Sequence, residues 1–292
     1  MSASRASTIG PNDWDRLITP AAPWWRVDLH ELWRYRDLVL LLVKRDITAQ
    51  FKQTILGPLW LILQPLLTTA VYTVMFGMIT RSSPPGVPAL LFYLSGIVPW
   101  IYFSGLVNRT SRTFTGNASV LTKVYFPRLV MPLSTMLGAL FQFAVQFALL
   151  LLIFVWFLVF RGFHWTPDAG LLALPIALLV MSLLGLGAGI LVSALTTRYR
   201  DLGFLVTYGI QLLMFISPVI FPISLIIEKA PFLVPLVKAN PMTGVIEGIR
   251  SGLFGTPLDV LSLAYSGLFA VVLFLAGLAM FQRVERSFAD TV

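Results

Sequence analysis

The chain of 292 residues contains no cysteine and only two histidines. Without a thiol it has no thiol catalysis, no cysteine-ligated metal and no disulfide, and the redox compartment stays undetermined. The histidines, His30 and His164, are far apart in the sequence, so we expect no metal site. The phosphate-binding motif G-x-x-x-x-G-K-[ST] is also missing, so this chain is not expected to hydrolyse ATP.

Charged residues are missing from six long stretches of the sequence. No Asp, Glu, Lys, Arg or His occurs in residues 56–80, 89–107, 129–160, 171–197, 202–227 and 260–282. A helix needs about 20 apolar residues to cross about 30 Å of hydrocarbon, so each stretch is long enough to span a bilayer. The sequence therefore predicts an all-α membrane protein with six transmembrane helices. Because these helices lack ionisable groups, we do not expect proton relays through them.

Apolar residues dominate the composition, which is 57% hydrophobic and 12% charged with a mean hydropathy of +0.84. These values are typical of membrane proteins with several spans. We expect a flexible cytoplasmic leader (1–27), an amphipathic interfacial helix (28–55), a transmembrane domain of six spans (56–282) and a cytoplasmic tail (283–292). The first 37 residues mix acids with bases and have no long apolar core, so they are not a cleavable signal peptide.

The basic residues, which give a net charge of +8, gather on one side of the predicted spans. Sixteen of the 21 Lys and Arg precede span one, lie between spans two and three, or follow spans four and six. Loops rich in Lys and Arg stay on the cytoplasmic side, so both termini are predicted to be cytoplasmic. Because membrane topology accounts for the excess of Lys and Arg over Asp and Glu, we expect no nucleic-acid partner.

Residues 28–55 have the pattern of a helix that lies on the membrane surface. Asp28 and Glu31 resemble a capping box, and apolar residues then recur at helical spacing against basic ones. The uninterrupted apolar run, residues 38–43, is too short to span a bilayer. We expect the apolar side to face the membrane and the basic side to face water or a partner, and membrane anchoring alone explains the pattern equally well.

Residues 222–257 combine short apolar runs with helix breakers such as Asn240-Pro241. Runs too short to span, interrupted in this way, are typical of a re-entrant or interfacial hairpin. We therefore expect an outer-side re-entrant helical hairpin between spans five and six. Glu247 and Arg250 share one face of its last helix, as the members of ordinary surface ion pairs also do.

Two further patterns concern how the spans pack. Residues 129–160 are more than a bilayer needs, so the third span should tilt or project into the cytoplasm. Gly185, Gly187 and Gly189 in the fourth span permit close contact between helices, and packing is the expected reason for them rather than ligand binding.

Several short motifs, in order and at consistent spacing, resemble one family of transporters. They are KRD (44–46), LGPLW (56–60), KVYFPR (123–128), RYRDL (198–202), SPV (217–219) and NPM (240–242) with Glu247 and Arg250. From about residue 33 to its end, the chain resembles the membrane subunit of bacterial ABC-2 type polysaccharide exporters. This group includes O-antigen, capsule and teichoic-acid permeases.

The resemblance implies a homodimer in the bacterial inner membrane, with a conduit for a lipid-linked polysaccharide at its interface. It also implies two copies of a separate ABC ATPase subunit, which would hold ATP and magnesium, so this chain would be a permease subunit without a cofactor and not an enzyme. The cytoplasmic loop 110–123 would then couple the two subunits through Arg109, Arg112, Asn117, Leu121 and Lys123. Cytoplasmic topology accounts equally well for its basic residues.

A conduit for sugars needs aromatic platforms and neutral hydrogen-bonding groups more than fixed charges. Three spans carry such residues at helical spacing: Trp60, Gln64, Tyr72 and Phe76; Tyr93, Trp100 and Phe103; and Phe204, Tyr208, Gln211 and Phe215. The resemblance favours the first and third sets as conduit walls. Aromatic residues in membrane helices also pack against neighbours or anchor at the interface, and this alternative stays open for each of them.

The sequence leaves the cargo open and is less consistent with two other classes of membrane protein. The sequence does not distinguish O antigen from capsule or teichoic acid, nor from a smaller lipid or drug carried by an exporter of the same architecture. An ATP-independent channel or secondary transporter is disfavoured because the spans lack charge. A membrane transferase is disfavoured because acids and bases on the outer side are scattered without a motif.

Overall fold

The computed structural model describes residues 29–79, 83–113, 126–166, 168–196, 199 and 201–291, and these are helical with no strand. The helices are α1 (Leu29–Arg34), α2 (Arg36–Phe51), α3 (Trp60–Tyr72), α4 (Ala89–Thr110), α7 (Val130–Phe160), α8 (Ala173–Thr196), α9 (Leu202–Ile216), α10 (Ile223–Lys229), α11 (Val234–Ala239), α12 (Pro241–Phe254) and α13 (Val260–Thr291). The all-α prediction is confirmed. The predicted leader, 1–27, lies outside the described residues.

Within the described ranges, five helical segments are long and apolar enough to cross a membrane. They are Gly57–Gly77, Ala89–Thr110, Val130–Phe160, Gly170–Thr196 and Val260–Arg283. Each coincides with one of the charge-free stretches. The first of them changes character along its length, because α3 continues from Thr73 to Ile79 as a π-helix, a conformation that is rare and often found at functional sites.

The remaining charge-free stretch, residues 202–227, is not one helix. The helix α9 has 15 residues and ends at Ile216, and α10 begins only at Ile223. Pro218 and Pro222 account for the break, since proline lacks the amide hydrogen of a helix and clashes with the preceding turn. At about 1.5 Å per residue α9 is about 22 Å long, less than the thickness of the hydrocarbon core. A single helix over residues 202–227 is therefore not observed, and the sixth predicted transmembrane helix is not confirmed.

The N-terminal helices differ from the single helix expected over residues 28–55. Tyr35 separates α1 from α2, and α2 ends at Phe51. Val39 and Leu42 of α2 are buried against the start of α7, in a small cluster that also contains Phe126, Val130 and Met131. Asp28 of the capping pattern lies outside the described residues.

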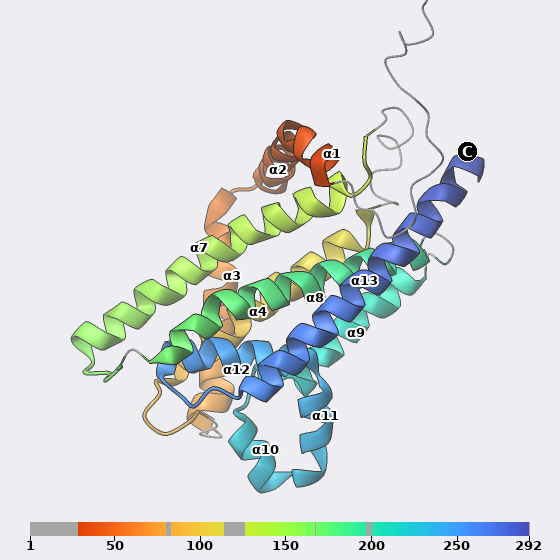
Figure 1. The fold of residues 1–292 in the computed structure, drawn as a ribbon. Coiled ribbons are helices and arrows are strands. Elements are labelled where there is room, and N and C mark those ends of the chain that lie inside the picture. Colours follow the sequence, from red (N-terminus) through yellow and green to blue (C-terminus); the bar gives the residue numbers. More distant parts are fainter. Residues whose placement is uncertain are drawn as a thin grey trace, which may run out of the picture.

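The helices place the N-terminal pair and the C-terminus at the same end of the molecule (Figure 1). At the opposite end the chain forms α10, α11 and α12. Helix α4 lies at the centre and packs against α3, α7, α8 and α12, while α8 packs most extensively against α13. Segments that are far apart in the sequence therefore meet on α4.

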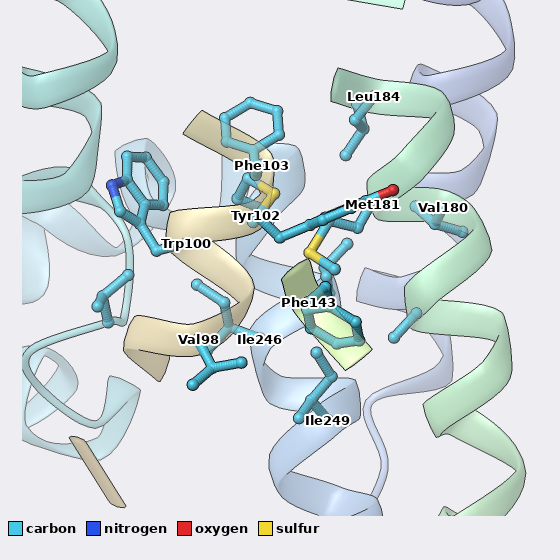
Figure 2. Packing of buried hydrophobic residues seen from close by; sticks show 14 of the residues in the cluster. Val98, Trp100, Tyr102, Phe103, Phe143, Val180, Met181, Leu184, Ile246 and Ile249 are labelled. Atoms are coloured by element: carbon cyan, nitrogen blue, oxygen red, sulfur yellow. The ribbon is translucent and has the colours of Figure 1, made fainter. Parts of the chain in front are cut away.

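The main core forms where α7, α8 and α12 converge on α4. Figure 2 shows Phe143 of α7, Met181 of α8 and Ile249 of α12 gathered beside Tyr102 of α4. The rings of Tyr102 and Phe143 are 5.2 Å apart between centroids, and the Tyr102 hydroxyl is hydrogen-bonded to the Ser182 hydroxyl at 2.8 Å. The same core contains Tyr93, whose buried hydroxyl has no hydrogen-bond partner among the described residues.

The glycines of α8 lie where neighbouring helices approach most closely. A methyl group added at Gly187 would be 2.7 Å from the backbone of Phe274 in α13, and one at Gly189 would be 2.5 Å from Thr110 in α4. One at Gly185 would be 2.8 Å from Leu106. At Gly187 the contacted atoms are backbone, so a larger side chain would require the helices to shift, whereas at Gly185 and Gly189 the side chains of Leu106 and Thr110 would have to move. The prediction that these glycines serve close packing is confirmed.

Candidate functional site

The predicted conduit residues of α9 form one exposed face of that helix. Phe204, Tyr208 and Phe215 are 73%, 66% and 58% exposed, and Gln211 between them is also exposed. Their spacings of four, three and four residues place them on the same side of a helix with 3.6 residues per turn. The described helices therefore leave three aromatic rings and an amide largely exposed on this face.

The set predicted on the first span divides between surface and core. Trp60 and Gln64 are exposed, whereas Tyr72 and Phe76 are half-buried and meet edge to face with ring centroids 5.8 Å apart. Phe76 also lines a cavity of about 460 Å³ together with Phe215 at the end of α9. The structure thus brings one residue of each of these two predicted sets to the same cavity, beside the α10–α11 segment.

The set predicted on the second span is buried. Tyr93, Trp100 and Phe103 of α4 are 0%, 5% and 6% exposed. Figure 2 shows Trp100 and Phe103 within the packed residues around α4, and Trp100 and Phe103 are 5.6 Å apart between ring centroids. These side chains therefore present almost no surface that a sugar could reach in this conformation.

Arg250 of α12 is the most buried charged side chain that the structure describes, at 3% exposed. Its Nη1 donates to the Glu247 carboxylate at 3.1 Å, and its Nη2 donates to the carbonyl oxygen of Val219 at 3.1 Å. Its guanidinium carbon lies 3.9 Å from the centre of the Phe92 ring. The pair predicted as an outer surface feature is therefore a link between α12, α4 and the α9–α10 connection.

The backbone around Arg250 is built to let these parts meet. Gly96 of α4 faces the connection so closely that an added methyl group would be 2.8 Å from the Val219 carbonyl oxygen and 3.1 Å from Arg250 Nη2. Only a residue without a side chain fits there. Burial lowers the pKa of the Arg250 guanidinium, and the charge of Glu247 opposes that shift. Arginine keeps its charge because its ordinary pKa lies far above neutral pH.

Asn240 fixes the start of α12 relative to α9. Its side-chain oxygen accepts from the backbone N–H of Met242 at 3.0 Å, which caps the helix, and its amide nitrogen donates to the Ser217 hydroxyl at 2.7 Å. Pro241 occupies the first turn, where it needs no hydrogen bond, and Gly255 ends the helix with a φ of +66°. The motif SPV and the motif NPM are thus in direct contact.

At the other end of the molecule, three polar side chains connect α2, α7 and α4. Arg109 Nη2 donates to Gln142 Oε1 at 2.6 Å, and the amide of Gln142 donates to Gln50 Oε1. These residues, with Arg45 and Arg112, line a polar cavity of about 570 Å³. Of the predicted coupling residues, Arg109 and Arg112 are therefore placed beside α2. Asn117, Leu121 and Lys123 lie outside the described residues.

Sequence reasoning did not identify Gln50 and Gln142 as partners of Arg109. Gln142 lies in a mostly apolar helix and is buried at 9% exposed, and an amide in such a helix is a signal in principle, because it needs a partner once buried. Across the described parts of the chain, no group of three or more His, Cys, Asp or Glu side chains is placed to hold a metal ion.

Comparison with known proteins places most of the chain in one family. A model of the ABC-2 type transporter family matches residues 37–254, from α2 to the end of α12. The chain is 28% identical over 265 residues to the O-antigen export system permease protein RfbA of Myxococcus xanthus, which covers 90% of this chain and 98% of that protein. A Klebsiella pneumoniae protein with the same name is 26% identical over 255 residues, with 87% and 94% covered. The polysialic acid transport protein KpsM of Escherichia coli is 25% identical over 245 residues, with 83% and 92% covered.

Proposed function

Since the chain belongs to the ABC-2 type transporter family, we propose that it is the membrane subunit of an exporter of lipid-linked polysaccharide. The observation that carries the proposal is the nearly full-length match to proteins named for O-antigen export and for polysialic acid transport. O antigen is the specific cargo we propose, because the relatives with the higher identities carry that name. As a permease the chain is not itself an enzyme.

We further propose six crossings of the inner membrane, with α9 as the crossing that is too short to span by itself. The same-end placement of α1, α2 and the C-terminus supports an even number of crossings. A short helix is tolerated at membrane depth where the adjoining irregular backbone is covered by protein, and Ser217 and Val219, which follow α9, are fully buried. The segment α10–α12 would then be the outer re-entrant hairpin, and α1–α2 the cytoplasmic interfacial helices.

The conduit is proposed at the interface of a homodimer, with the exposed face of α9 as part of its wall. Gln211 and Tyr208 would be poorly placed against lipid, which offers no hydrogen bonds. Sugars offer hydroxyl groups to an amide and apolar faces to aromatic rings. Trp60 and Gln64, which are exposed on the first span, are proposed as further wall residues, and Phe76 and Phe215 would border the outer end.

Energy for export would come from two copies of a separate ABC ATPase, with ATP and magnesium bound there. We propose that the loop after α4 contacts this ATPase and that the connection from Arg109 through Gln142 to Gln50 makes α4 and α2 move together. Arg112 at the same cavity, and Asn117, Leu121 and Lys123 in the loop, are proposed contacts. Movement of α4 would reach the outer hairpin through Phe92 and Arg250.

Deletion of the gene tests this function directly. The expected result is accumulation of lipid-linked glycan on the cytoplasmic leaflet and loss of glycan from the cell surface, with both reversed by a plasmid copy. The readout is surface glycan by immunoblot together with extracted lipid-linked glycan by mass spectrometry. Normal surface glycan in the deletion strain would contradict the proposal, and accumulation of a small lipid instead would reassign the cargo.

A further inference from the structure

An apolar groove of about 680 Å³ lies under the N-terminal helices, away from the proposed conduit face. Five helices form its walls, with Leu32 from α1, Leu40 from α2, Leu133 and Leu137 from α7, Ile190 from α8 and Leu278 from α13. Among the described residues, Arg36 is the only charged side chain in its lining. The groove therefore has an apolar interior and a cationic group at one place on its border.

We propose that this groove binds one acyl chain of an anionic membrane phospholipid, whose phosphate is held by Arg36. Water in this apolar groove would find few hydrogen-bond partners, whereas a hydrocarbon chain would bury apolar surface and make van der Waals contacts there. The groove is lined in part by α1 and α2, which lie at the same end of the molecule as the C-terminus (Figure 1), where a headgroup and the start of an acyl chain would lie in the leaflet. The leaflet assignment rests on the proposed topology and is independent of the cargo.

The charge at the border selects the type of lipid. Arg36 is on the surface, with 57% of its side chain exposed, and lies over the ring of Trp33 at 5.5 Å. Its carboxylate neighbour, Asp37, is 3.8 Å away and 86% exposed, so water screens that contact. A guanidinium so placed can donate to phosphate oxygens, and the anionic lipids of the cytoplasmic leaflet supply them. An exposed Trp33 suits the headgroup level, where tryptophan is enriched.

The test is a titration of the purified full-length chain with phosphatidylglycerol and, separately, with phosphatidylcholine, read by native mass spectrometry. We expect one phosphatidylglycerol per chain, bound about tenfold more tightly than phosphatidylcholine. Arg36→Gln should remove this preference and Arg36→Lys should retain part of it. Leu133→Trp, which fills the groove, should weaken both lipids, whereas Leu152→Trp, on the exposed side of the same helix, should change neither.

A second measurement locates the lipid without the Leu133→Trp variant, whose larger side chain could itself disturb the packing. Phosphatidylglycerol with brominated acyl chains should quench the fluorescence of the wild-type protein more than that of Trp33→Phe, at the concentration that saturates the mass-spectrometric site.

Three results would overturn the proposal. The first is equal phosphatidylglycerol binding by Leu133→Trp, Leu152→Trp and the wild type. The second is co-purification of a polyprenyl-linked glycan that phosphatidylglycerol does not displace, which would make the groove a cargo site. The third is lipid binding only after removal of residues 1–27, which would show that the leader of the chain fills the groove.

Discussion

Arg250→Ala is expected to lower the free energy of unfolding by about 3 kcal/mol, the lower end of the range for removing one partner of a buried ion pair. The lower end applies because Glu247 is 30% exposed and can be partly hydrated once its partner is gone. The substitution also leaves the Val219 carbonyl without its donor and removes the cation from the Phe92 ring. The measurement is an SDS titration of the purified protein in mixed micelles.

Two controls test whether the effect comes from the buried position of Arg250 or only from the loss of a positive charge. Lys238→Ala, at an exposed position of the neighbouring α11, should change the midpoint little, since surface substitutions usually stay within about 0.5 kcal/mol. The double variant Glu247→Leu with Arg250→Met should be more stable than Arg250→Ala, because apolar replacement of both partners leaves no charge unpaired. Equal effects of Arg250→Ala and Lys238→Ala would show that Arg250 does not connect α12 to α4.

The triple substitution of Tyr208, Gln211 and Phe215 by alanine is expected to lower the rate of export about tenfold while the subunit still assembles with its ATPase. Each aromatic contact contributes about 0.5–1.5 kcal/mol beyond its buried area, and about 1.4 kcal/mol in total corresponds to a factor of ten. The side chains are exposed on the described chain, so their removal leaves no cavity in the core. Export is measured as the rate of appearance of surface glycan after induction.

A matched substitution on the same helix keeps this prediction specific. Leu205 and Leu212 are exposed to a similar degree, at 67% and 66%, but carry neither a ring nor an amide. Replacing both by alanine removes apolar surface beside the proposed wall and should leave export near the wild-type rate, with assembly checked by co-purification in each case. If the triple variant exports normally, or if both sets reduce export equally, the α9 face is not a binding wall for sugars.

The five crossing helices were predictable because the signal for them is local. A stretch of about 20 residues without charge indicates a helix in the hydrocarbon core of a bilayer, where charged side chains are costly. This pattern can be recognised without knowing how the helices pack or what they bind. The same criterion failed at residues 202–227, where apolar content continued through Pro218 and Pro222 while the helix did not. An apolar sequence indicates that a segment is buried away from water, but it does not show whether that segment is helical. Irregular backbone that is covered by protein can have the same apolar composition as a helix.

The functional residues were harder to recognise, because their roles depend on contacts across the sequence. The spacing of Glu247 and Arg250 predicted a shared helix face, but nothing local indicates that Phe92 and Val219 cover it. Likewise, aromatic residues at helical spacing are as typical of a core as of a conduit. Tyr93 and Tyr208 both fitted the pattern, and only the structure distinguishes the buried residue from the exposed one.

We propose that the conduit of this permease carries no charged groups and that a separate ATPase subunit drives transport through it. The most direct test of this proposal is reconstitution of the purified chain in vesicles, with and without the ATPase subunit, followed by measurement of lipid-linked glycan that becomes accessible on the opposite face. The account predicts ATP-dependent movement only when both subunits are present. Movement by the chain alone, with ATP or with a proton gradient, would contradict it.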